Sequence, residues 1–216
     1  WTMDQVKLHY PEIVADYTYM GAKTEQCFAD DVLGNWWSER CDTVVVLGRV
    51  VPGKRIEFAI EFVNKIRKLG ITVNLLIVGS ADAAYAADIN KLIAGKSYVE
   101  WKQGLNREQL ESVISSCKWG LHCALFEHYG ISALELQRLG CLTLVPNSCG
   151  QAELVEDARF SYKDIDDLVE KFSNIYLDES LQGIFNLHRS KKVLEHNFTQ
   201  HDEYMLSYIK ALENES

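Results

Sequence analysis

The sequence has no long apolar run, and this absence limits the kinds of protein it can encode. Among its 216 residues, no stretch approaches the roughly 18 consecutive apolar residues of a membrane-spanning helix. The start of the chain also lacks the basic segment followed by an apolar one that marks a signal peptide. The first residue is Trp1 rather than methionine, so we expect a processed protein or a fragment of a longer one.

Basic residues and paired cysteines are also scarce. Lysine and arginine number 22 against 31 aspartate and glutamate residues, which gives a formal net charge of −9. A nucleic-acid-binding protein needs a net basic face, so we expect no nucleic-acid partner. None of the six cysteines forms a C-x-x-C pair, which argues against a zinc site. Cys117, Cys123 and Cys141 lie in apolar segments, and we expect buried free thiols of a reducing compartment.

What the sequence does contain is a regular alternation of strand and helix patterns. Hydrophobic residues make up 47% and charged residues 25%, a balance that supports a globular core. Apolar runs bounded by glycine are typical of strands buried on both faces, and apolar residues spaced by three and four are typical of helices. Predicted strands cover 44–47, 73–78, 98–101, 119–123 and 141–145, and predicted helices cover 56–69, 83–94, 106–117, 130–140 and 165–175. This order predicts an α/β fold with a doubly wound parallel sheet.

Three parts follow from these patterns. Residues 1–40 are aromatic-rich and irregular, and we expect a linker or N-terminal extension. Residues 41–180 form the predicted sheet domain, and residues 181–216 are predicted C-terminal helices with a break near Asn197. In a doubly wound sheet, ligands bind beyond the carboxyl ends of the strands. The loops that follow the predicted strands are therefore where we expect a site.

The most informative of these loops holds two glutamates. Glu127 precedes Gly130 at a predicted strand-to-helix turn, and Glu135 lies about one turn into the helix that follows. Two carboxylates and a helix N-terminus in one small volume suit a ligand with both hydroxyl groups and a diphosphate, such as a nucleotide sugar. The alternative is that the glutamates only complement the helix dipole. A second glycine-bearing turn at 148–153 favours a site.

A second candidate loop spans residues 48–55. It nearly matches the phosphate loop G-x-x-x-x-G-K-[ST], and it follows a strand and precedes a helix as that motif requires. Arg55 replaces the hydroxyl residue that would hold Mg²⁺, which argues against a nucleoside triphosphatase. Arg49 and Lys54 can instead both reach a diphosphate, through charge-assisted hydrogen bonds of about 1.5–3 kcal/mol each. The alternative is that they are two solvated surface cations.

Three other kinds of site fit the sequence poorly. A dinucleotide-binding turn needs G-x-G-x-x-G, whereas the first turn here has glycines only at 48 and 53. A glycosidase places carboxylates on both sides of the scissile bond, whereas Glu127 and Glu135 would lie on one side of a ligand. His122 and His128 have no third metal ligand at a suitable spacing, and we expect polar residues at the mouth of the sheet.

Together these motifs resemble the C-terminal domain of retaining glycosyltransferases with the GT-B fold, in the family 4 group. The resemblance runs from about Tyr10 to the C-terminus. It rests on Gly48-Arg49 with Lys54, Val78-Gly79-Ser80, residues 99–104, the E-x7-E segment 127–135, and residues 148–153. The sequence around 127–130 is also similar to that of lipid-linked-oligosaccharide mannosyltransferases.

The resemblance implies a role for each site residue. Arg49 and Lys54 would hold the donor diphosphate and Glu127 would bind the sugar hydroxyls, which makes these three the expected catalytic residues. Glu135 would bind the ribose hydroxyls. The other expected donor-binding residues are Gly48 in the phosphate loop, Tyr129, Gly130 and Ile131 through backbone N–H groups, and Trp101, Lys102 and Gln103 around the base. No metal or other cofactor is expected, because fixed cations and helix N–H groups would replace Mg²⁺.

The resemblance also implies what lies outside this chain. A GT-B enzyme has two domains, and residues 41–180 match only the one that binds the donor sugar nucleotide. We therefore expect a GDP- or UDP-hexose donor, an unknown acceptor held by a missing N-terminal domain, and no transfer by this part alone. Such a protein would be cytoplasmic, with any peripheral membrane contact made through the absent domain.

Departures from the family pattern leave other functions open. Cys123-Ala124 replaces the usual Pro-Ser, Arg55 replaces a glycine, residues 136–138 replace Ala-Met-Ala, and residues 149–152 replace Gly-Gly-x-Pro. These changes leave the donor sugar undetermined and permit a non-catalytic nucleotide-sugar-binding or scaffolding subunit. A GT-B sugar-nucleotide epimerase is a third alternative.

Overall fold

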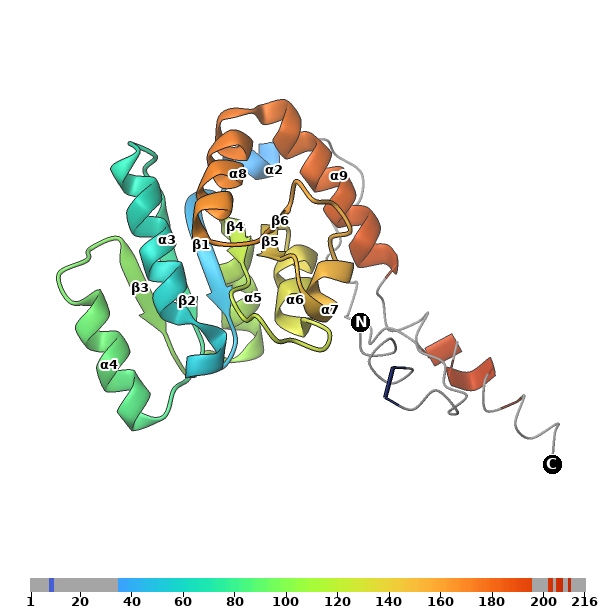
Figure 1. The fold of residues 1–216 in the computed structure, drawn as a ribbon, viewed down its shortest axis with the longest axis horizontal. Coiled ribbons are helices and arrows are strands. Elements are labelled where there is room, and N and C mark those ends of the chain that lie inside the picture. The colour runs from blue at the N-terminus through green and yellow to red at the C-terminus, as the bar shows by residue number, and fades with distance from the viewer. Residues whose placement is uncertain (1–7, 10–34, 196–201, 204, 208–209, 211–216) are drawn as a thin grey trace.

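The computed structural model describes residues 8–9, 35–195, 202–203, 205–207 and 210 (Figure 1). The predicted linker around Tyr10 and the predicted helix break near Asn197 lie outside these residues. The division of the chain at positions 41 and 181 stays a prediction. Among the described residues, no helix is both long enough and apolar enough to cross a membrane.

A single parallel sheet of six strands forms the centre of the described fold. Its spatial order is β3-β2-β1-β4-β5-β6. Every pair in the ladder is parallel, and β1 lies between β2 and β4, with Val44 opposite both Leu75 and Trp119. The strands are β1 (Cys41–Leu47), β2 (Asn74–Val78), β3 (Val99–Lys102), β4 (Cys117–Leu121), β5 (Leu142–Pro146) and β6 (Ser161–Tyr162). The doubly wound α/β sheet predicted from the sequence is therefore confirmed.

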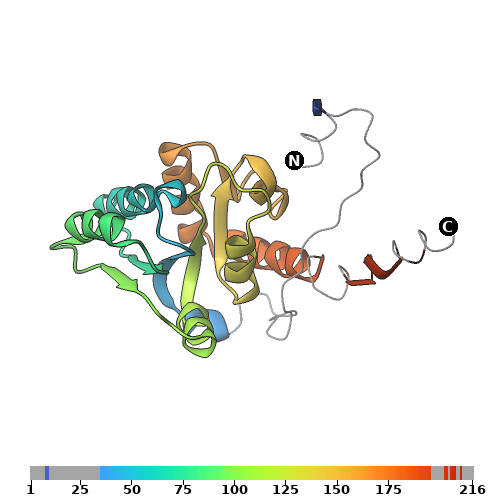
Figure 2. The same ribbon diagram turned by 90° about the horizontal axis from the view of Figure 1, so that it is seen from below.

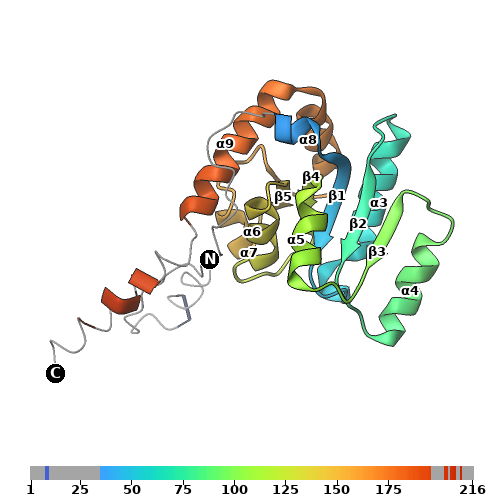
Figure 3. The same ribbon diagram turned by 180° about the vertical axis from the view of Figure 1, so that it is seen from behind.

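Helices cover both faces of this sheet. On one face α3 packs against α4 and α8, and on the other α5 and α6 pack against β4, as Figures 1 and 3 show from opposite sides. Helix α9 packs on α6 and β5. The longer helices are α3 (Ile56–Lys68), α4 (Ala83–Ile93), α5 (Arg107–Ser115), α6 (Ile131–Arg138), α8 (Ile165–Leu177) and α9 (Glu179–Glu195).

The alternation of side chains along β1 explains why the protein has two apolar clusters. Val44 and Val46 pack in the larger cluster, whereas Val45 and Leu47 pack in the smaller one. Successive strand residues point to opposite faces, so a continuous apolar run is what a strand buried on both faces requires. Trp119 lies in the larger cluster, with its ring centroid 5.0 Å from that of Phe172 in α8.

Short elements are the main additions to the predicted fold. They are α2 (Asn35–Ser38), the 3-10 helix η1 (Pro52–Lys54), α7 (Cys149–Glu153) and β6. Each has at most five residues, too few for an apolar period to be recognised in the sequence. Three predicted strands are also shifted in position, and β3 runs one residue later than the predicted 98–101. β4 begins and ends two residues before the predicted 119–123, and Pro146 is the last residue of β5 rather than the residue after it.

Candidate functional site

The two loops that carry the predicted site residues begin at adjacent strands. β1 is followed by η1 and α3 on one face of the sheet, and β4 is followed by α6 on the other. The chain therefore diverges at the carboxyl ends of β1 and β4, which is where open α/β sheets bind ligands. Figure 2 views the molecule from the side toward which the β1 arrowhead points in Figure 1.

The loop after β1 is held by close contact with the loop after β2. A Cβ atom added to Gly79 would lie 1.8 Å from the carbonyl oxygen of Gly48, so only glycine lets the two backbones approach this closely. The N–H of Val50 donates to the carbonyl of Ser80 at 2.9 Å. These contacts fix the start of the segment that ends in η1 and therefore fix the position of Lys54.

The loop after β4 is held by the turn that follows β5. The N–H of Gly150 donates to the carbonyl of Glu127 at 3.0 Å, and the Gln151 amide donates to the carbonyl of Ala124 at 3.2 Å. A Cβ atom on Gly150 would lie 1.7 Å from the carbonyl oxygen of His128. Residues 148–151, which we call the strap, therefore contact the loop that carries Glu127 directly.

Lys54 and Glu127 meet at this point although 73 residues separate them in the chain. The Lys54 ammonium forms an ion pair with Glu127 Oε2, and both side chains are 25% exposed. The pair is thus accessible to a ligand but partly shielded from water. Lys54 is not a solvated surface cation, so for this residue the alternative interpretation was wrong.

His122 lies behind this ion pair, directly after β4. Its side chain is 3% exposed, its Nδ1 lies 3.3 Å from the Ser132 hydroxyl, and its Nε2 lies 3.8 Å from Glu127 Oε2. Nε2 is fully buried and makes no hydrogen bond among the described residues. Burial lowers the pKa of His122 to about 4, helped by the nearby Lys54 charge and opposed by Glu127. The imidazole is therefore neutral at pH 7.

Glu135 belongs to a separate charge network. Its Oε1 accepts from the Arg107 guanidinium at 2.6 Å, and Arg107 also donates to Glu111 at 2.6 Å. Arg138, 2% exposed, donates to the same Glu111 oxygen at 2.8 Å, and this guanidinium is the first cause of a lowered Glu111 pKa. The sequence interpretation missed Arg107. The available signal was its position. Arg107 is the first residue of α5, the helix that follows β3, so it lies near the carboxyl ends of the strands, as the start of the Glu135 helix does.

The residues between the two glutamates start helix α6. Gly130 has a φ of 94° and precedes the first helical residue, Ile131. A left-handed residue at this place turns the chain from the loop into the helix, and the first N–H groups of an α-helix have no partner within it. Ile131 is 48% exposed and Tyr129 is half-buried, with burial raising the pKa of its phenol.

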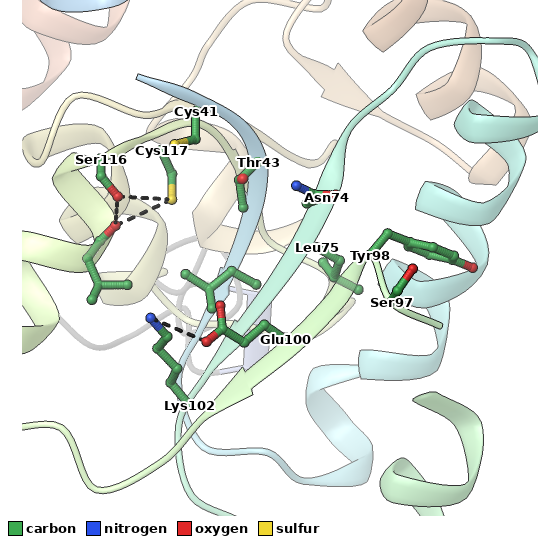
Figure 4. A pocket seen from close by; sticks show the side chains of 12 residues that line it. Cys41, Thr43, Asn74, Leu75, Ser97, Tyr98, Glu100, Lys102, Ser116 and Cys117 are labelled. Atoms are coloured by element: carbon green, nitrogen blue, oxygen red, sulfur yellow. Dashed lines mark hydrogen bonds and ion pairs between the residues drawn. The ribbon is translucent and has the colours of Figure 1, made fainter. Parts of the chain in front are cut away.

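The other predicted site residues have less defined surroundings. Arg49 is exposed and makes no ion pair with another described residue. The Trp101 indole N–H donates to the Gly79 carbonyl at 2.8 Å, and Gln103 is exposed. Lys102 lies 3.4 Å from Glu100 in a groove of about 250 Å³, whose other lining residues include Thr43, Asn74 and Cys117 (Figure 4). These roles stay predictions.

The departures at Arg55 and Cys123 are compatible with the fold. Arg55 has a φ of 52°, its guanidinium carbon lies 4.4 Å from the Phe58 ring centroid, and it donates to the Cys123 carbonyl at 3.4 Å.

Cys117, Cys123 and Cys141 are buried free thiols, as predicted. In the described part of the chain, no three His, Cys, Asp or Glu residues are grouped to hold a metal ion.

Comparison with known proteins identifies the family. The model for glycosyl transferases group 1 matches residues 37–189, which include both glutamates and the whole described sheet. The chain belongs to this family. The resemblance inferred from the sequence motifs is thereby confirmed, and the family assignment covers the sheet and the helices on both faces.

This group 1 chain is similar in sequence to curated enzymes and similar in fold to solved glycosyltransferase-type structures. It is 28% identical over 135 residues to a Dictyostelium discoideum GDP-Man:Man(3)GlcNAc(2)-PP-Dol alpha-1,2-mannosyltransferase, covering 60% of this chain and 26% of that protein. Sucrose-phosphate synthase from Thermosynechococcus elongatus superposes with a TM-score of 0.79 at 16% identity, over 99% of this chain and 57% of the other. Anabaena Alr3699/HepE in complex with UDP-glucose gives 0.69 at 14% identity, over 79% and 49%. The chain spans about a quarter of the length of the curated relatives it matches.

Proposed function

We propose that this chain is the donor-binding part of a retaining hexosyltransferase that uses a GDP- or UDP-hexose. The single observation that carries the proposal is the contact between Lys54 and Glu127 at the carboxyl ends of β1 and β4. It places one cation and one carboxylate together at the point where α/β sheets bind ligands. A diphosphate-linked sugar needs both groups, since its phosphates are anionic and its hydroxyls donate hydrogen bonds.

The chemistry follows from where negative charge develops. Breaking the bond between the sugar and the diphosphate leaves charge on the phosphate oxygens. Lys54, Arg49 from the same loop, and the N–H groups at the start of α6 would stabilise that charge in place of a metal ion. Glu127 would hold sugar hydroxyls and fix the orientation of the ring. The absence of a metal from this mechanism is part of the proposal.

The nucleoside end of the donor would contact different residues. Glu135 lies in the helix that starts at the phosphate site, and Arg107 binds its Oε1, so its other carboxylate oxygen is the proposed acceptor for the ribose hydroxyls. The backbone at 101–103 would line the base. This assignment leaves the Lys102 ammonium paired with Glu100 in its groove and assigns it no direct contact with the donor.

The relatives narrow the donor and acceptor classes. The D. discoideum relative is named for a GDP-mannose donor and a lipid-linked glycan acceptor, and the Anabaena structure contains UDP-glucose. These two support a nucleotide-hexose donor and favour a glycan acceptor for this chain. We propose that the acceptor is bound mainly by residues outside this chain, since the chain covers only 26% of the length of the D. discoideum relative.

Calorimetric titration of the full-length protein with GDP, UDP, GDP-mannose and UDP-glucose tests the proposal. We expect one nucleotide pair to bind, with the sugar form distinguishable from the free diphosphate. Transfer to a glycan acceptor, followed by NMR of the anomeric proton, then tests retention of configuration. Absence of binding by all four ligands at millimolar concentration would contradict the proposed donor class.

One observation favours a second function, a non-catalytic nucleotide-sugar-binding subunit. Both glutamates are already neutralised, one by Lys54 and the other by Arg107. If these pairs persist with ligand bound, each paired carboxylate oxygen has less capacity left to accept a hydrogen bond from a sugar hydroxyl. Nucleotide-sugar binding with neither transfer nor donor hydrolysis by the full-length protein would support this alternative over the first.

A further inference from the structure

His122 Nε2 is one of five buried side-chain polar atoms without a hydrogen bond among the described residues, and it lies next to the Lys54–Glu127 pair. The backbone of His122 is held on both sides: the His122 backbone N–H donates to the Leu144 carbonyl at 3.0 Å, and the His122 backbone carbonyl accepts from the Tyr162 hydroxyl at 2.6 Å. The side chain is only 3% exposed, so the ring has little room to turn Nε2 toward another group. A buried nitrogen without a hydrogen bond is costly, so it is expected to have a partner in another state of the site.

Glu127 is the nearest candidate for that partner. Its Oε2 lies 3.8 Å from Nε2, which is longer than a hydrogen bond by less than an ångström, and the same oxygen is held by Lys54. The carboxylate is 25% exposed and lies on a loop, so it can move by that distance. The groups around the imidazole are Lys54 from η1, Glu127 from its loop, Ser132 from α6 and Tyr162 from β6.

A donor diphosphate would change this arrangement. Its phosphates carry more negative charge than one carboxylate, so they compete for the Lys54 ammonium, and Glu127 then loses its cation. A partly shielded carboxylate needs a replacement donor, and the buried imidazole is the group next to it. The Ser132 hydroxyl at Nδ1 can donate to that nitrogen, which leaves the proton on Nε2 and directs it at Glu127.

We propose that His122 is a positioning residue that takes over Glu127 from Lys54 when the donor binds, holding the carboxylate for the sugar hydroxyls through an Nε2–H hydrogen bond. This inference rests on the proposed function and deepens it. Lys54 and His122 would act in turn on one carboxylate oxygen. No proton transfer is involved, because the imidazole stays neutral and donates the same hydrogen throughout.

Two substitutions at this position separate positioning from packing. His122→Gln puts an amide N–H donor near the place of Nε2, whereas His122→Asn puts its amide near Nδ1, where it reaches Ser132 but not Glu127. Both keep a polar side chain of similar burial, so each serves as the folding control for the other. The measurement is the dissociation constant of the full-length protein for GDP-mannose, UDP-glucose and the matching diphosphates.

The expected result is selective. His122→Asn should weaken binding of the nucleotide sugar by about 10- to 100-fold, the effect of one hydrogen bond to a charged group. It should weaken binding of the free diphosphate less, because water can then solvate the partly exposed Glu127 carboxylate. His122→Gln should restore most of the sugar affinity. In the parent, ¹⁵N-histidine NMR should show a neutral imidazole protonated at Nε2, with the proton signal moving downfield when the nucleotide sugar is added.

Each contrary outcome has a distinct meaning. If the parent binds the nucleotide sugar and both variants bind it equally well, the role of His122 is overturned while the proposed function stands. The same conclusion follows if NMR finds the proton on Nδ1 with the donor bound, or if Asn and Gln weaken sugar and diphosphate alike. A parent that binds neither ligand overturns the inference and the proposed function together.

Discussion

The two glutamates of the site differ in how they are held. Glu127 lies on a loop that is shaped by the strap, and its cation, Lys54, comes from a different loop. Glu135 lies within a helix, and its cation, Arg107, is shared with Glu111, which also binds the buried Arg138. One carboxylate is held by a single exchangeable ion pair, and the other is part of a network with several members.

If the donor binds as proposed, this difference predicts separate roles for the two carboxylates. An isolated pair can be opened by a ligand that offers the cation more negative charge, whereas removing one charge from a network leaves the others in place. A diphosphate would therefore rearrange the Glu127 side and leave the Glu135 side unchanged. The Glu127 region is suited to changing its contacts when the donor binds, and the Glu135 region to holding a part of the ligand that does not react.

The largest expected effect is on the Lys54 side of this comparison. Lys54→Ala removes the proposed phosphate cation and leaves Glu127 without its ion-pair partner, so we expect the nucleoside diphosphate to bind about 100-fold more weakly. The nucleoside without phosphates should bind as before. Lys65→Ala is the matched control, because Lys65 pairs with Asp166 on the surface of α3 and α8. Equal diphosphate affinities of parent and Lys54→Ala in calorimetry would exclude the proposed phosphate role.

The dependence of Glu127 on the strap gives the next prediction. Gly150→Ala places a Cβ atom against the His128 carbonyl, and we expect it to lower the free energy of unfolding by about 1–3 kcal/mol. Gly53→Ala is the control, because its added Cβ has no neighbour within 4 Å and it should change stability by less than about 0.5 kcal/mol. Urea unfolding measures both. Equal urea midpoints for Gly150→Ala and Gly53→Ala would mean that the strap can shift at little cost and does not fix the position of the Glu127 loop.

A smaller effect is expected on the Glu135 side. Glu135→Gln should weaken the nucleoside and its diphosphate by the same factor of about 10, because only the ribose contact is lost. Glu127→Gln should instead affect only ligands that carry the sugar. Titrations of nucleoside, diphosphate and nucleotide sugar with both variants measure this contrast. If the two substitutions gave the same profile, the two carboxylates would not have separate roles.

The sequence predicted the sheet well because its strands are buried on both faces. Runs such as 44–47 and 74–78 have no other simple interpretation between helical patterns. The helix predicted over 106–117 begins at Asn106, which forms a capping box with Gln109. The two site loops could be recognised in the sequence because the glycines, carboxylates and cations that mark each loop lie within about ten residues of one another. The meeting of Lys54 with Glu127 was anticipated only through the rule that ligands bind at the carboxyl ends of the strands.

The pairing of side chains across the fold was beyond the sequence. Arg107 contacts Glu135 across a separation of 28 residues, and nothing in either local pattern specifies that contact. The state of His122 depends on burial by β5, β6 and α6 together, and burial is a property of the assembled sheet. The contact of Gly150, in the short helix α7, with the 127–128 loop is likewise a property of the assembled fold.

The last prediction uses pH to separate the two regions. The pKa of His122 falls from 6.5 to about 4 on folding, so between these values the unfolded chain binds a proton that the folded chain does not. Stability should therefore decrease as pH falls from about 6.5 to 4, by at most about 1.4 kcal/mol per pH unit from this residue. His122→Gln should remove that part of the slope in urea unfolding, whereas Glu135→Gln should leave it. An unchanged slope in His122→Gln would place the imidazole in contact with solvent and would contradict its burial behind the Lys54–Glu127 pair.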